Sequence, residues 1–250
     1  MKVIFNADDF GFSKGVNLGI LEAYQNGPVR SATLMPGMPG FEHAVLLAKA
    51  NPGLQTGVHL TLTAGNSVGG VYRTLTHGDG RFLRLAELER MAKSNEINPA
   101  EVEAEYEAQI QKVLSAGLKP SHFDSHHHTH TLPGMMAVFL KLAAKYGVKA
   151  RMFDKKPLAG AYAGIRTADA FSGAFYGETA TLAELCRILS AHGSAGSLEI
   201  MCHPAYVDHS LYASSSYSVR RAYELHVLTS AELMRFLEGH GITPCSFSDI

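Results

Sequence analysis

The sequence predicts an α/β protein, built either as a parallel barrel or as an open sheet covered by helices. Short β-rich runs alternate with longer helical patterns from one end of the chain to the other. The chain has 250 residues, of which 46% are hydrophobic, and this suits a single domain over residues 1–250 with a sizeable core. Polar clusters follow several predicted strands, which is where parallel α/β folds place their functional groups.

The first third of the chain consists of repeated strand and helix units. Apolar runs predict three strands, over residues 2–6, 31–35 and 56–62. A helix is expected from the N-cap Ser13 to about Gly27, and a second over residues 41–50. Residues 65–80 are rich in Gly, Thr and Asn and predict a long loop, which could form part of a substrate rim.

The remainder continues the alternation. Apolar residues at helical spacing predict helices over residues 99–116, 133 to about 147, 181–191 and 230–240. Four further strands are expected, over residues 121–124, 148–152, 197–202 and 242–247. Gly117 suits the left-handed position that ends a helix, and Pro133 suits the first turn of one.

Charge and composition narrow the range of partners. The 22 Lys and Arg residues balance the 23 Asp and Glu residues to a formal net charge of −1, so neither nucleic acid nor an anionic membrane is expected as a partner. No apolar run approaches the roughly 18 residues that cross a bilayer. The separated cysteines Cys186, Cys202 and Cys245 fit reduced thiols, and with no signal-peptide core at the start they predict a cytoplasmic location.

Two adjacent acids follow the first predicted strand. Of Asp8 and Asp9, one carboxylate could bind a metal while the other abstracts a proton. For the pair taken alone, a turn closed by Asx hydrogen bonds is the more frequent arrangement. His59 interrupts the third apolar strand, and a lone histidine there is more often a hydrogen-bonded core residue than a ligand. The acid pair and His59 therefore indicate a metal site only if other ligand residues lie beside them.

The histidine cluster is the most specific feature. Five of the 13 histidines fall within nine residues: His122, His126, His127, His128 and His130. Imidazole is the commonest metal-binding side chain, so a metal role is favoured over a hydrogen-bonded network or a solvated loop. At most two of them can ligate one ion, and the others are expected to orient ligands or contact substrate.

Further candidates follow later strands. His203 could donate a proton to a leaving group or contact substrate, although a surface-loop histidine is as frequent. Arg151 could pair with a catalytic carboxylate, against the more common strand-end ion pair. The rings of Phe175, Tyr176 and Tyr206 are candidates for sugar stacking, and a core role is at least as common for them.

Taken together, four motifs closely resemble the YdjC-type carbohydrate deacetylases, and among them the chitooligosaccharide deacetylases. They are Asn-Ala-Asp-Asp-Phe-Gly from Asn6, Gly-x-His-x-x-Leu-Thr around His59, Asp-Ser-His-His-His-x-His from Asp124, and Met-Cys-His-Pro ending in Pro204. The resemblance implies a distorted (β/α) barrel of the TIM-barrel-like glycoside hydrolase and deacetylase type. It also implies one divalent metal ion and hydrolysis of N-acetyl groups from chitobiose-type oligosaccharides in phosphorylated form.

The family's functional residues map onto this chain one by one. The resemblance places the metal ligands on Asp9, His59 and His126, the catalytic base on Asp8 and the acid on His203. Six further residues are expected to contact substrate or support the site: Asp124, His127, His128, His130, Arg151 and Tyr176. The resemblance favours Mg²⁺, whereas two imidazoles among the ligands favour Zn²⁺. The expected partner is an acetylated chitooligosaccharide, and a homodimer is left open.

Two other functions fit parts of the pattern. The His-x-His spacings of His126, His128 and His130 also occur in histidine-rich-barrel phosphoesterases and amidohydrolases, which generally carry them after the first strand. A metal- or sugar-binding protein without catalysis would make Asp8 dispensable.

Overall fold

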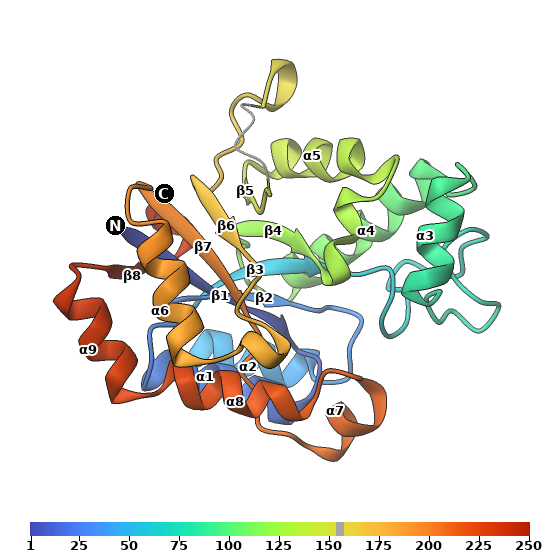
Figure 1. Cartoon of the computed structure of the whole chain (residues 1–250). Coiled ribbons are helices and arrows are strands. Elements are labelled where there is room, and N and C mark those ends of the chain that lie inside the picture. The colour runs from blue at the N-terminus through green and yellow to red at the C-terminus, as the bar shows by residue number, and fades with distance from the viewer. Residues whose placement is uncertain (154–157) are drawn as a thin grey trace.

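The computed structural model describes residues 1–153 and 158–250 and contains a curled sheet of eight parallel strands surrounded by helices (Figure 1). The strand order is β5-β4-β3-β2-β1-β7-β6, and β8 pairs with the beginning of β1. The two edge strands, β5 and β6, are linked by one hydrogen bond, which the Ala150 amide of β5 donates to the carbonyl of Arg166, a residue that precedes β6. The predicted distorted (β/α) barrel is confirmed.

The strands have the following bounds: β1 Lys2–Phe10, β2 Ser31–Leu34, β3 Gln55–Leu60, β4 His122–Ser125, β5 Lys149–Ala150, β6 Ala170–Ser172, β7 Ser197–Cys202 and β8 Thr243–Cys245. The α-helices are α1 Lys14–Gln25, α2 Phe41–Ala50, α3 Leu85–Lys93, α4 Pro99–Ser115, α5 Met135–Tyr146, α6 Leu182–Ala191, α7 His209–Ser214, α8 Val219–Leu228 and α9 Ala231–Gly239.

β1 is the central strand, and it is longer than predicted. Every residue from Val3 to Phe10 is buried, and Phe10 still pairs with Leu34 of β2. The expected turn at Asp8 and Asp9 is therefore wrong, because pairing with β2 keeps both acids in the strand. A register irregularity after Ala7 accompanies this, and Asp9 has a left-handed φ of 69°.

The local signals at Ser13 and Gly117 are confirmed, whereas Pro133 is not in the first turn of a helix, because α5 begins at Met135 after the N-cap Gly134. The Ser13 side chain accepts the Val16 amide and caps α1, and Gly117 has a φ of +78° just after α4. α1 lies against the chain that follows β7, so closely that a Cβ on Gly19 would come within 2.4 Å of the Ala205 Cα. α1 therefore presses directly on a loop that leaves the carboxyl end of the barrel.

Other boundaries differ from the prediction. β5 has only two residues instead of residues 148–152, and β8 ends at Cys245 before a short 3-10 turn. Residues 65–80 do form a loop, with only the isolated bridges of Asn66 with Arg81 and Thr76 with Phe82 near it. The sequence patterns missed β6, α3, α7 and α8; β6 has three residues, and the buried face of α8 includes charged side chains that break the apolar period.

Two global features complete the fold. The chain ends lie side by side, since the Thr243 amide donates to the Met1 carbonyl, and Figure 1 shows the N- and C-termini together. Among residues 1–153 and 158–250, none of the helices combines the length and the apolar character that crossing a membrane requires.

Candidate metal and catalytic site

Polar side chains from the carboxyl ends of four strands meet at one cavity of about 760 Å³. Asp8 and Asp9 come from the end of β1, His59 from β3, His126 from just after β4 and His203 from just after β7. Because parallel strands end at the same rim of a barrel, residues far apart in the sequence become neighbours here. The volume lies within the usual range for small-molecule sites.

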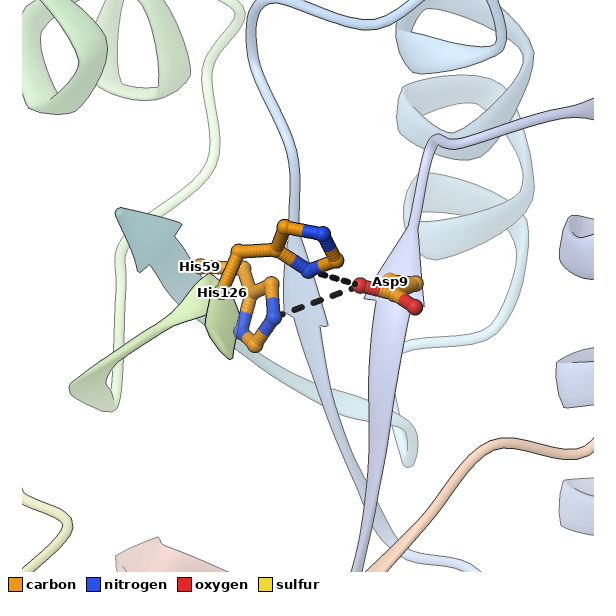
Figure 2. Close-up of side chains that lie close together, drawn as sticks. All are labelled: Asp9, His59 and His126. Atoms are coloured by element: carbon orange, nitrogen blue, oxygen red, sulfur yellow. Dashed lines mark ion pairs between the residues drawn. The ribbon is translucent and has the colours of Figure 1, made fainter. Parts of the chain in front are cut away.

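Asp9, His59 and His126 converge on one point (Figure 2). Oδ1 of Asp9 lies 2.9 Å from His126 Nδ1 and 3.3 Å from His59 Nε2. The three ligand atoms all lie within 4.8 Å of one another, and the residues are buried. The adjacent strands β1, β2, β3 and β4 bring them together.

This donor set fits a divalent metal ion. Asp9 Oδ1 is buried and accepts no hydrogen bond within the described part of the chain, although it faces two ring nitrogens. The far nitrogen of His59, Nδ1, lies 2.8 Å from Asp124 Oδ1, which is the carboxylate contact that orients metal-bound histidines. Burial opposes a charged ring, but Asp124 and Asp9 raise the pKa of His59 to about 10.

Asp8 is held by an arginine rather than by the histidines. Arg151 is fully buried, and its two terminal nitrogens each donate to one Asp8 oxygen at 2.7 Å. Its Nε donates to Glu199 Oε1 at 2.7 Å, and its Nη1 lies 3.2 Å from Asp124 Oδ2. Burial alone would raise the pKa of Asp8, but Arg151 holds it well below its usual range. A second group that could hold a metal, Asp8 with His59 and Asp124, is thus occupied by the guanidinium.

The other oxygen of Asp9 has its own arginine. Nη2 of Arg221, on α8, donates to Asp9 Oδ2 at 2.7 Å. Burial opposes ionisation of Asp9, yet His126 and Arg221 hold its pKa well below the usual value. The Asp9 carboxylate is therefore ionised. Its Oδ2 is bound to the Arg221 guanidinium, and its Oδ1 faces the two imidazole rings.

His203 is supported by a buried glutamate on α8. The His203 amide donates to Glu224 Oε2, and His203 Nδ1 lies 3.6 Å from Glu224 Oε1. The hydroxyl of Tyr217 also donates to Glu224, and burial and Glu224 raise the pKa of that phenol. Tyr217 stacks on Tyr176 at 3.9 Å between ring centroids, and both rings lie near His203. This half of the cavity joins a carboxylate, an imidazole and an aromatic wall.

The remaining predicted residues divide between the cavity and its surroundings. His127, His128 and Tyr176 line the cavity, and both histidines have left-handed φ angles. Burial lowers the pKa of His127 to about 3 and that of His128 to about 4, so both rings are neutral at pH 7.

The other candidates do not line the cavity. His130 stacks on Phe139 and contacts Ser125 Oγ. Phe175 is completely buried as a core residue, and Tyr206 is 48% exposed outside the cavity lining. Within the part of the chain that is described, the metal-capable groups exclude His128 and His130, so the His-x-His spacings do not assemble one site.

Sequence reasoning missed Arg221, Glu224 and Tyr217. Arg221 and Glu224 are three residues apart and share one face of α8, and both are buried. A basic and an acidic residue at helical spacing was the only local signal, and such pairs are common on exposed helix faces. Their burial is visible only in the folded protein.

Comparison with known proteins identifies the family. A family model described as YdjC-like protein matches residues 2–239. A protein of Brevibacillus brevis named carbohydrate deacetylase is 44% identical over 255 residues and covers 100% of both chains. A carbohydrate deacetylase of Listeria monocytogenes serotype 4a is also 44% identical, over 252 residues with the same coverage.

Solved structures with a similar fold include relatives of the same kind. One from Enterococcus faecalis V583, named as a cellobiose-phosphate cleavage protein, has a TM-score of 0.89 at 32% identity and covers 99% of this chain and 98% of that chain. A family 4 carbohydrate esterase from Streptomyces lividans shares the fold, with a TM-score of 0.50 at 16% identity over 98% of this chain and 91% of that chain. As the sequence motifs predicted, the chain belongs to the YdjC-like family.

Proposed function

We propose that this carbohydrate deacetylase uses one divalent metal ion to hydrolyse the N-acetyl group of a chitooligosaccharide such as diacetylchitobiose, releasing acetate. The observation that carries the proposal is the Asp9, His59 and His126 set opening onto a cavity that also contains Asp8 and His203. The names of the Brevibacillus and Listeria relatives support the reaction class.

In this proposal Asp9, His59 and His126 hold the ion. The chemistry that such an ion supplies when bound is a lowered pKa for a water molecule and a polarised acetyl carbonyl. Two imidazoles and one carboxylate suit Zn²⁺ by donor type, and the family resemblance favours Mg²⁺. Elemental analysis of the purified protein separates the two.

Asp8 acts as the general base. Its carboxylate is ionised because Arg151 donates to both oxygens, and the Asn6 side chain donates to Oδ1 at 2.8 Å. These contacts weaken its proton affinity but fix its orientation toward the cavity, where it accepts a proton from the attacking water. Arg151 therefore orients the base.

His203 acts as the general acid. An amine is a poor leaving group unless it is protonated, so a donor is needed on the leaving side of the acetamide. Glu224 Oε1 lies 3.6 Å from His203 Nδ1, on the side of the ring away from Nε2, so Nε2 is the nitrogen that would face the substrate. The adjacent Tyr176, 42% exposed and stacked on Tyr217, offers a ring face to the sugar.

The loop after β3 contributes cationic side chains to the cavity lining, and these suit a phosphorylated sugar. His77, Arg81 and Arg84 of the loop after β3 all line the cavity. The loop is anchored to α4, because Glu105 accepts the amides of Val68 and Gly69 at 2.9 Å each. A cationic rim on an anchored loop favours a phosphate substituent. The name of the Enterococcus neighbour, which refers to a sugar phosphate, supports this substrate.

The state of the cysteines supports a proposed location. Cys186, Cys202 and Cys245 are all free thiols, and a reducing compartment keeps them so. We therefore propose a cytoplasmic location.

Acetate release from diacetylchitobiose and its 6-phosphate, with and without a chelator, tests the proposal. We expect release with both, loss on chelation and recovery on adding back Zn²⁺ or Mg²⁺. Phosphate release without acetate would instead support a phosphoesterase, and saturable binding without turnover would support a binding protein.

The phosphate subsite has a separate test. We expect Arg84→Gln to raise KM for the 6-phosphate roughly tenfold while leaving KM for the neutral disaccharide unchanged, because it removes one charge-assisted contact. Arg73→Gln is the matched control, since Arg73 lies on the same loop and outside the cavity lining. An equal change for both substrates would contradict a phosphate contact.

A further inference from the structure

We infer that Arg221 is a positioning residue that makes Asp9 present a single oxygen to the metal ion. The inference rests on the proposed metal role of Asp9 and extends it to a residue on α8, outside the barrel strands. Arg221 lies 212 positions from Asp9 in the sequence and meets it through one hydrogen bond of 2.7 Å.

The two oxygens of Asp9 have separate partners. Oδ2 receives the Arg221 Nη2 hydrogen, while Oδ1 faces His126 Nδ1 at 2.9 Å and His59 Nε2 at 3.3 Å. Asp9 is 1% exposed and Arg221 is 3% exposed, so water does not compete for the contact. Without the arginine, Oδ2 would be free to rotate toward the ion or into the cavity.

The guanidinium itself is held firmly. Its Nε donates to the Tyr217 carbonyl at 2.7 Å, and the group lies over the rings of Tyr217 and Phe12 at 5.5 Å and 5.9 Å. The Ala205 amide donates to the Arg221 carbonyl, which ties α8 to the loop after His203. Within the described residues, the remaining nitrogen Nη1 has no acceptor, so Asp9 is the one carboxylate to which the side chain donates.

The backbone conformation of Asp9 is also unusual. Asp9 has a φ of 69°, a conformation that residues other than glycine rarely adopt and that persists only where surrounding contacts hold it. Partners that orient metal ligands typically change affinity by about 10–100-fold when removed. A nearby positive charge would by itself repel a cation, so the sign of the change discriminates between orientation and repulsion.

The test measures Zn²⁺ affinity by calorimetry on the full-length, chelator-stripped protein. We expect Arg221→Gln to weaken binding about 10–100-fold and Arg221→Lys to fall between, because an ammonium keeps the charge but cannot donate to Asp9 and to the Tyr217 carbonyl in the same planar geometry. Arg220→Gln should bind as the unmodified protein does, since Arg220 is the preceding residue of α8 and pairs with the exposed Glu178. Circular dichroism confirms that each variant is folded.

The outcomes are distinct. Unchanged or tighter Zn²⁺ binding by Arg221→Gln overturns the inference, while the proposed function stands if the unmodified protein still binds Zn²⁺ and releases acetate. If the unmodified protein binds no ion through His59, both fail together. Should Arg221→Gln not fold, Arg221→Lys decides, because an affinity equal to that of the unmodified protein at a lowered melting temperature would show a purely structural role.

Discussion

Asp8 and Asp9 are neighbours in the sequence, yet each faces a different arginine. Arg151 takes both oxygens of Asp8, whereas Arg221 takes only one oxygen of Asp9. Both oxygens of the first carboxylate are therefore bound to a guanidinium, and the second keeps Oδ1 for the imidazoles. At the scale of single residues, the pairing with arginine separates the proposed base from the proposed metal ligand.

Asparagine substitutions distinguish these two roles. Asp8→Asn should keep the metal and lose about 10²- to 10⁴-fold in turnover, because an amide cannot accept the proton of water. Asp9→Asn should instead weaken metal affinity, because a neutral amide oxygen is a poorer ligand for a divalent cation. Metal content and acetate release at saturating metal check both. An empty site in Asp8→Asn beside an intact one in Asp9→Asn would reverse the assignment.

Arg151 is expected to govern stability as well as orientation. Arg151→Met should lower the free energy of unfolding by about 3–5 kcal/mol at pH 7, because it leaves buried carboxylates without a counter-charge. The pKa of Asp8 is lower when folded, so its contribution is present above its unfolded value of about 3.9 and is lost as the pH falls through the folded value. The gap between the two proteins should therefore shrink from pH 7 to pH 3.

Urea unfolding at both pH values measures this difference. The matched control is Arg187→Met, since Arg187 is an exposed partner of Glu184 and such pairs contribute little. A gap that stays constant or widens toward pH 3 would contradict the proposed pairing.

At the scale of elements, helices outside the barrel reach the rim through close contacts. α8 supplies Arg221 and Glu224. α1 packs on the loop after β7, which contains His203 and Tyr206. A Cβ on Gly19 would lie 2.4 Å from the Ala205 Cα and 2.7 Å from its carbonyl carbon, both backbone atoms. The glycine sets the distance between α1 and this loop.

Gly19→Ala should therefore destabilise the protein by roughly 1–3 kcal/mol, as overpacking does, although alanine is the better helix former. Gly239→Ala is the control: it is the last residue of α9, and its Cβ would meet nothing within 4 Å. That change should stabilise by about 0.4–1 kcal/mol. Chemical denaturation gives both values, and stabilisation by Gly19→Ala would show that the contact is loose.

For the whole molecule, the proposed metal site depends on the folded barrel. Its ligands come from β1, β3 and the turn after β4, and they lie 50 and 67 positions apart along the chain. The unfolded chain does not hold these side chains together, so an ion that binds there binds the native state preferentially.

Added metal should accordingly raise the melting temperature. At a free Zn²⁺ concentration about 100 times Kd, linkage gives about 2.7 kcal/mol, or roughly 5–10 °C for a chain of this size. Scanning calorimetry with and without a chelator measures the shift. His59→Ala should abolish most of it, and an equal shift in that variant would place the ion elsewhere.

The sequence by itself determined the fold class, most of the long elements and those rim residues that lie in its motifs, such as Asp8, Asp9, His59, His126 and His203. The reason is local: period-2 and period-3.6 apolar patterns, Ser13 as an N-cap and the motifs around Asp8, His59 and the histidine cluster are properties of short segments. Short strands such as β6, and α8 with its buried charges, carry no such pattern, and they were missed.

Only the tertiary structure decided which groups are partners. Arg151 could as well have been an ordinary strand-end arginine, and nothing near Asp9 in the sequence indicates Arg221. Their choice of carboxylate depends on strand order and on how α8 packs over the barrel rim. Burial then makes these pairings strong, because removing water raises the cost of an unpaired charge, and burial is a property of the whole fold.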